Sequence, residues 1–142
     1  MYTAAVLDEP SASFLRSFSE ENLGDLSKFV FLTNQGQRLP HHMTVNLGPF
    51  HIDLNPGLSL GDTVILRVDK LARNDRIGVC AACVEAAVCD SKPLRSTNRH
   101  PHVTVCIMPW SRPKDSNKIF DLSDTVWEFR TCELEAVLTE VK

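Results

Sequence analysis

The chain has 142 residues, of which 43% are hydrophobic and 23% charged, with a formal net charge of -3 at pH 7. This composition is typical of a single globular domain, residues 1–142, with its own core. It argues against a protein that grips long stretches of nucleic-acid backbone, because such proteins are usually basic. The longest apolar stretch, residues 77–88, is too short and interrupted for a membrane span, and the N-terminus lacks a secretory signal pattern.

The N-terminal quarter is predicted to form a strand, a helix, a second strand and a turn. Residues 2–7 (YTAAVL) read as a strand, and Ser11 is a candidate N-cap for the helix that follows. Gly24 fits the end of that helix. Residues 28–33 (KFVFLT) predict a strand, and residues 34–37 (NQGQ) predict a turn.

The middle of the chain is dominated by a predicted hairpin. Prolines and glycines mark a loop over residues 48–61. Two long β-leaning runs follow, residues 62–72 and residues 77–88, joined by the turn-like residues 73–76 (RNDR). This pairing indicates an antiparallel hairpin.

The C-terminal part predicts an exposed loop and a closing strand. Residues 111–118 (SRPKDSNK) are polar and read as the loop. Within residues 126–141, Leu134, Ala136 and Leu138 alternate with polar residues, which is typical of a strand with one buried face. The fold class that follows is α+β, rich in antiparallel strands and poor in helix.

Cysteine usage indicates an intracellular protein, in the cytoplasm or nucleus. The five cysteines are an odd number without a secretory context: Cys80, Cys83, Cys89, Cys106 and Cys132. The first two form a C-x-x-C string, but the second pair of ligands that a structural zinc needs is missing. We therefore expect buried or half-buried thiols and no metal site.

The string His-x-Thr-Val occurs twice, at residues 42–45 (HMTV) and residues 102–105 (HVTV). Each copy lies in a β-branched, strand-like run. Residues i and i+2 of a strand project from the same face. Each copy is therefore predicted to present an imidazole and a hydroxyl on one face, and two apolar side chains toward a core on the other.

Together the two copies would place His42, Thr44, His102 and Thr104 around one small space, a set suited to acid–base chemistry on a phosphate. Opening a phosphodiester requires one proton to be taken from the attacking oxygen and another to be given to the leaving oxygen. Histidine is the side chain whose ordinary pKa allows both tasks near neutral pH. Threonine hydroxyls can donate hydrogen bonds to the non-bridging oxygens.

Other candidates carry weaker signals. His41, His51 and His100 are interpreted as surface histidines. Phe50 and Trp110 follow the two motif runs by a few residues, where a ring could stack on a base. Core packing is the favoured interpretation of Phe50, whereas base stacking and packing stay equally open for Trp110, which we retain as a candidate substrate-binding residue.

Basic residues gather between the second half of the hairpin and the predicted exposed loop. They could draw in a phosphate chain, or they could simply form a solvated loop surface. They are Lys92, Arg95, Arg99, Arg112, Lys114 and Lys118.

The motifs resemble those of the 2H phosphoesterase superfamily, which is named for two H-x-[T/S]-x motifs. The resemblance rests on HMTV at residues 42–45, the Leu47-Gly48 pair after it, and RHPHVTV at residues 99–105. The order of opening strand, helix, first motif, hairpin, second motif and closing strand covers nearly the whole chain. The superfamily includes RNA 2′,5′-ligase-like proteins, plant cyclic phosphodiesterases and the cyclic phosphodiesterase domain of fungal tRNA ligases.

The resemblance implies a compact, bilobal, pseudo-symmetric fold with antiparallel sheets, few outer helices and a central active-site groove. It implies that His42 and His102 act as general base and general acid, with the order of the two roles left open by the sequence. It also implies that Thr44 and Thr104 bind phosphate. No cofactor or metal is expected.

The function expected from these residues is a metal-independent phosphodiesterase that opens 2′,3′-cyclic phosphates of RNA ends or nucleotides, in RNA end processing or repair. The alternatives are a 2′,5′-oligonucleotide phosphodiesterase and a non-catalytic module that binds nucleotides or RNA ends. The expected partners are an RNA terminus or a nucleotide cyclic phosphate, and an RNA ligase or kinase module. We expect a monomer that does not contact a membrane.

Overall fold

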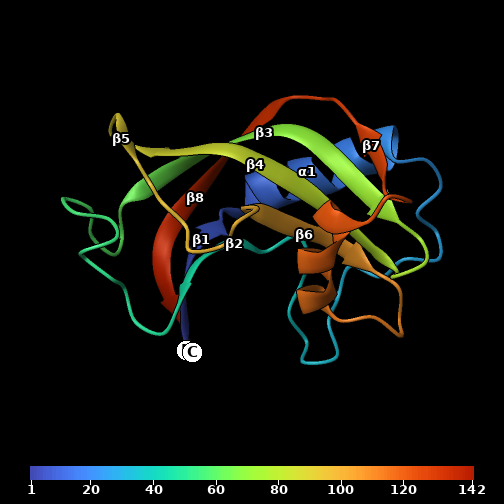
Figure 1. Cartoon of the computed structure of the whole chain (residues 1–142), viewed down its shortest axis with the longest axis horizontal. Coiled ribbons are helices and arrows are strands. Elements are labelled where there is room, and N and C mark those ends of the chain that lie inside the picture. The colour runs from blue at the N-terminus through green and yellow to red at the C-terminus, as the bar shows by residue number, and fades with distance from the viewer.

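The strands form one antiparallel sheet that closes into a barrel, as the computed structural model of all 142 residues shows (Figure 1). Its strands are β1 (Tyr2–Leu7), β2 (His42–Leu47), β3 (Thr63–Asn74), β4 (Val79–Cys89), β5 (Lys92–Pro93), β6 (His102–Ile107), β7 (Val126–Glu128) and β8 (Cys132–Val141). The sheet order is β5-β4-β6-β2-β1-β8-β3-β7, and β3 also pairs with β4. This last pairing closes a ring of six strands and leaves β5 and β7 outside it.

Only two helices accompany the barrel, the α-helix α1 (Glu9–Asn22) and the 3-10 helix η1 (Pro113–Asp121). The α+β class with mostly antiparallel strands is therefore confirmed. Neither helix has the length and apolar character that crossing a membrane requires.

The predicted hairpin is confirmed and forms the longest pairing of the barrel. β3 and β4 run antiparallel from the Ile65–Val88 pair to the Asn74–Val79 pair, so the turn falls close to the predicted residues 73–76. The predicted closing strand is confirmed over β8, which lies between β1 and β3 and completes the ring. The first residues of the predicted run form a separate strand, β7, which pairs with β3.

The barrel interior is the core of the protein. In β2 and β6, Met43, Val45, Val103 and Val105 are all at most 1% exposed, as the alternation of the two motifs predicts. Leu15 of α1 joins the same apolar cluster. Burying a side chain of this kind stabilises the fold by about 1.5–3 kcal/mol, so the core holds the two motif strands firmly in place.

The start of α1 differs from the prediction, whereas its end agrees. Asp8, and not Ser11, is the N-cap, because the Asp8 carboxylate accepts a hydrogen bond of 2.8 Å from the Ser11 backbone N–H. Pro10 then occupies the first turn, where its missing N–H does no harm. Gly24 follows the helix end with φ of +79°, a conformation that favours glycine.

The predicted strand over residues 28–33 is wrong, although the turn at residues 34–37 is present. The segment makes only two isolated bridges, Val30 with Ile107 and Leu32 with Arg38. Val30 exchanges two backbone hydrogen bonds with Ile107 at the end of β6, of 2.7 and 3.1 Å, and no other residue of the segment pairs with a strand of the barrel.

The predicted exposed loop over residues 111–118 is also wrong, because most of it lies in η1. Pro113 starts the helix, and the Asp115 carboxylate accepts a hydrogen bond of 3.0 Å from the Arg112 N–H. Ser111, Ser116 and Ile119 are buried, and the Phe120 ring packs beside Ile119. This polar stretch therefore contacts the barrel through a few side chains, whereas Arg112, Lys114 and Lys118 are exposed.

The thiols are buried or half-buried, as predicted. Cys80 of β4 pairs directly with Cys106 of β6, and Cys89 is buried too. Cys83 and Cys132 are half-buried, and burial raises the pKa of each to about 11. Cys83 and Cys132 are therefore protonated and unreactive at neutral pH.

The Gly78→Ala variant tests how tightly the turn after β3 is packed. Gly78 has φ of +67°, and a Cβ there would lie 2.5 Å from Ser111 Oγ and 2.8 Å from the Trp110 ring. Gly36→Ala is the control, with φ of +82° and open space around the added Cβ. We expect the control to lose about 1 kcal/mol of unfolding free energy, and Gly78→Ala to lose a further ~1–3 kcal/mol because packed neighbours must move. Equal losses in urea unfolding would contradict this packing.

Candidate active site

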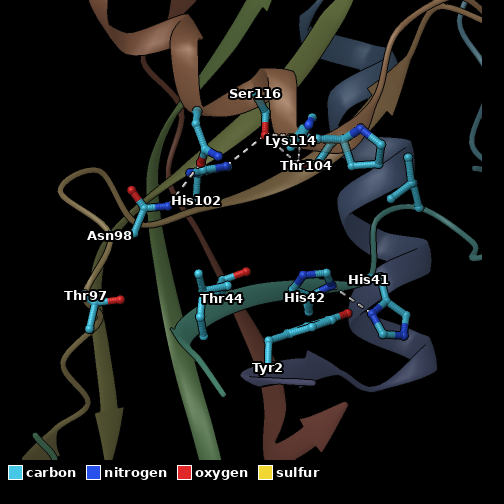
Figure 2. Close-up of a pocket in the computed structure, with 14 residues that line it drawn as sticks. Tyr2, His41, His42, Thr44, Thr97, Asn98, His102, Thr104, Lys114 and Ser116 are labelled. Carbon is cyan, nitrogen blue, oxygen red and sulfur yellow. Dashed lines mark hydrogen bonds between the residues drawn. The ribbon is translucent and has the colours of Figure 1, made fainter. Parts of the chain in front are cut away.

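The two motif strands are antiparallel neighbours that pair at one position, Met43 with Val103. Carried one residue either way, this register sets Thr44 beside His102 and His42 beside Thr104. Because residues i and i+2 share a face, all four polar side chains lie on the side opposite the core. Figure 2 shows them facing one space between β2 and β6.

A cavity of about 430 Å³ lies over these two strands. All four motif residues line it, so the structure brings together the histidines and threonines that the sequence singled out. The other lining residues are Tyr2, Leu39, His41, Leu47, Thr97, Asn98, Pro113, Lys114, Ser116 and Asn117.

His42 is half-buried and held from one side only. Its Nδ1 lies 2.9 Å from Nδ1 of His41, and the Tyr2 ring packs beside it with 4.9 Å between ring centroids. Nε2 of His42 has no protein partner. Burial, together with the charges of His41 and His102, lowers the pKa of His42 to about 4. His42 is therefore a neutral base at neutral pH.

His102 is held from both sides. Its Nδ1 lies 2.7 Å from the carbonyl oxygen of His100, and its Nε2 lies 2.9 Å from Oγ of Ser116. The Phe120 ring packs against it, with 5.2 Å between centroids. Burial lowers the pKa of His102, the hydrogen bond to His100 acts in the opposite direction, and the charge of His100 adds to the lowering.

The two threonines also differ in whether their hydroxyl groups have a hydrogen-bond partner. Thr104 Oγ1 lies 2.8 Å from Oγ of Ser116, whereas the hydroxyl of Thr44 has no protein partner. The Thr44 carbonyl accepts a hydrogen bond of 2.8 Å from Ser96, which fastens the loop before β6 to β2. Nε2 of His42 and the hydroxyl of Thr44 thus have no protein partner in the cavity. The matching atoms of His102 and Thr104 are both hydrogen-bonded to Ser116 of η1.

Ser116 is the residue whose role the sequence did not indicate. It lies 14 positions after His102, inside a polar stretch whose pattern predicts a loop. Only the packing of η1 on the barrel, through Ile119 against Ala72 and Ala81, brings it into the cavity.

Of the remaining histidines, two are half-buried and one is exposed. His41 is half-buried and bonded to His42, so its interpretation as a surface residue is wrong. His100 is half-buried as well, with its ring stacked on Phe120 at 4.9 Å. His51 is exposed, as predicted. The flanking position of His41 was the available signal, because a residue just before a motif strand can turn toward it.

Of the aromatic and basic residues that the sequence offered as candidates, one lines the cavity. Trp110 does not line it, and its ring lies beside Gly78 instead. Phe50 packs against the core, as favoured. Among the basic residues only Lys114 lines the cavity, where it is exposed and forms no ion pair. The basic residues away from the cavity are Lys92, Arg95, Arg99, Arg112 and Lys118.

Two further observations complete the description. No group of three or more histidine, cysteine, aspartate or glutamate side chains lies together in a way that could hold a metal ion. Comparison with known proteins finds no matching family model and no matching curated protein.

The pH dependence of stability tests the surroundings of His42. Its pKa in the folded chain is about 4, below the ordinary 6.5. Between these values the unfolded chain binds a proton that the folded chain does not. Stability is therefore full above pH 6.5 and falls as the pH drops toward 4, by on the order of 2–3 kcal/mol from this residue.

Denaturant unfolding of the wild type, His42→Gln and His51→Gln at pH 7.5 and 4.5 measures this loss. The exposed His51 is the control and should leave the loss unchanged. A His42→Gln variant that loses as much stability as the wild type between these pH values would contradict the assigned pKa.

Proposed function

We propose that the protein is a metal-independent phosphodiesterase that opens 2′,3′-cyclic phosphates at RNA ends or on nucleotides. The observation that carries the proposal is the placement of two imidazoles and two threonine hydroxyls from neighbouring strands around one cavity. Binding alone would not require two matched proton-transfer groups, whereas hydrolysis of a phosphodiester does.

In the proposed reaction, water attacks phosphorus in line with the leaving ribose oxygen. One of His42 and His102 takes a proton from the water as the new P–O bond forms. The other gives a proton to the ribose oxygen as its bond to phosphorus breaks, so the product is a phosphomonoester with one free ribose hydroxyl. Thr44 and Thr104 donate hydrogen bonds to the non-bridging oxygens, where charge collects, and Lys114 offsets the added charge at the cavity mouth.

The dimensions of the cavity support a small substrate. A volume of about 430 Å³ lies within the range of small-molecule sites. The absence of a second basic residue around the cavity fits a single phosphate group better than a long backbone. Both points favour a nucleotide or an RNA end.

We also propose the bilobal, pseudo-symmetric 2H arrangement for this chain. A local two-fold axis through the Met43–Val103 pair would exchange His42 with His102 and Thr44 with Thr104. Any antiparallel pair has such an axis, so the support for pseudo-symmetry comes from the same His-x-Thr-Val string lying on both sides of it.

The non-catalytic alternative has one observation in its favour. Nε2 of His102 is already hydrogen-bonded to Ser116. A ligand must replace this hydrogen bond before that nitrogen can exchange a proton with it. A 2′,5′-oligonucleotide substrate would use the same four groups. The experiment below distinguishes all three functions.

The first test is turnover of 2′,3′-cyclic nucleotides, an RNA with a cyclic phosphate end and a 2′,5′-linked oligonucleotide, each with a chelator present. We expect hydrolysis of a cyclic phosphate, with kcat reduced about 10²–10⁴-fold by His42→Ala or His102→Ala, because each removes one proton-transfer group. His51→Ala is the exposed control and should keep wild-type activity. Saturable binding without turnover would favour the binding module, and dependence on an added metal would overturn the mechanism.

A second test concerns Lys114. An exposed cation near a phosphate contributes about 1 kcal/mol or less, so we expect Lys114→Gln to raise KM by up to about fivefold and to weaken its salt dependence. Arg95→Gln removes the same charge from an exposed residue outside the cavity. Equal effects of the two substitutions on KM would mean that only the overall charge of the protein matters.

A further inference from the structure

The buried hydroxyl of Ser116 joins both motif residues of β6. Ser116 is 1% exposed, and its Oγ lies 2.9 Å from Nε2 of His102, 2.8 Å from Oγ1 of Thr104 and 2.6 Å from the carbonyl oxygen of Pro113. Figure 2 shows the hydroxyl between the two side chains. One hydroxyl thus serves three partners.

The number of protons in this group fixes the direction of each hydrogen bond. A carbonyl oxygen can only accept, and of the two hydroxyls near that of Pro113 the Ser116 hydroxyl is the nearer, at 2.6 Å against 3.4 Å for Thr104, so we assign the single proton of Ser116 to Pro113. The Ser116 oxygen then accepts from the Thr104 hydroxyl and from Nε2 of His102. Nδ1 of His102 also faces a carbonyl oxygen, that of His100 at 2.7 Å, and must donate as well.

Both ring nitrogens of a histidine donate only in the imidazolium form. A neutral His102 that donates from Nδ1 would need a proton from Ser116 at Nε2. The oxygens of Ser116 and Pro113 would then face each other at 2.6 Å with no proton between them, a repulsive contact. The imidazolium satisfies every partner in the group.

We propose that Ser116 is a positioning residue that favours a proton on Nε2 of His102 over a second ring proton on His42, and that His102 is therefore the acid and His42 the base of the site. The assignment of acid and base rests on the proposed function, whereas the protonation of His102 does not. When substrate binds, the Nε2 hydrogen bond passes from Ser116 to the departing ribose oxygen. Transfer of that proton leaves His102 neutral, with Nδ1 still donating to His100.

The groups that face His102 make its proton depend on Ser116. His42 from β2, His100 from the preceding loop and Lys114 from η1 carry no negative charge, and the register partner Cys83 from β4 has a pKa of about 11. Burial disfavours the imidazolium as well. Its support comes from two neutral oxygens, those of His100 and Ser116, so loss of one should release the proton.

His42 has the opposite surroundings, which suits the base. Its Nε2 has no protein partner. Its Nδ1 lies against the imidazole of His41, whereas Nδ1 of His102 lies against the carbonyl oxygen of His100. The two histidines of the repeated motif are thus equivalent in sequence but not in protonation.

The protonation of His102 can be measured directly by NMR of the protein labelled with ¹⁵N in its histidine rings, with the His102 signals assigned from their loss in His102→Gln. We expect wild-type His102 to lose its second ring proton at a higher pH than His42, although burial holds the pKa of both histidines below the ordinary 6.5. Ser116→Ala should lower the midpoint of its titration by about one pH unit, the equivalent of one hydrogen bond to a charged group. Ser116→Thr keeps the accepting oxygen and should restore the midpoint.

Ser111→Ala is the matched control, because Ser111 is another buried serine whose hydroxyl donates to a carbonyl, that of Ile77, outside the cavity. It should leave the His102 titration unchanged. A wild-type His102 that loses its second ring proton at the same pH as His42, or at a lower pH, would overturn the proposal without any variant and regardless of activity.

The pH profile of kcat/KM then tests the catalytic assignment. Because an acid must be protonated to act, activity falls as the pH rises through its pKa. Ser116→Ala should move this basic limb down by about one pH unit and leave the acidic limb, which belongs to His42, in place. Movement of the acidic limb instead would reverse the assignment. A His102 that loses its second ring proton at a higher pH than His42, in a protein that hydrolyses none of the three substrates, would uphold the role of Ser116 and overturn the proposed function.

Discussion

The site depends on one backbone contact, the pairing of Met43 in β2 with Val103 in β6. Each strand is fixed from behind by side chains that are almost fully buried in the barrel. Since the pair is antiparallel, the imidazole of one motif must face the hydroxyl of the other. Because the two strands share only this pair, they leave room above it for a cavity. The residues that pack in the core and the residues that line the cavity thus alternate along the same two strands.

The cavity wall formed by η1 removes the symmetry of this arrangement. The helix lies on the β6 side, where Ser116 reaches His102 and Thr104. No equivalent segment covers the β2 side, where His42 meets only His41 and the Tyr2 ring. The reaction that we propose takes one proton and gives another, so it needs two groups with different proton affinities. An asymmetric wall over a symmetric motif pair provides such a difference.

The parts of the fold that could be predicted are those governed by local alternation. The closing strand β8 and the β3–β4 hairpin carry a period of two in their burial, which survives in the sequence. Errors occurred where a residue's state depends on distant chain. Residues 28–33 have the composition of a strand but pair with the barrel at Val30 alone. The stretch that forms η1 is polar, and its two buried side chains, Ser116 and Ile119, give too weak a pattern to detect.

The sequence by itself determined the four polar groups of the site, His42, Thr44, His102 and Thr104, because residues two apart on a strand must share a face. It also determined the apolar faces behind them. Only the tertiary structure decided that the two strands are neighbours, that Lys114 is the basic residue at the cavity, and that Trp110 is not there. Those outcomes depend on how the barrel closes and where η1 packs, and contacts between residues far apart in the chain leave no periodic trace in the sequence.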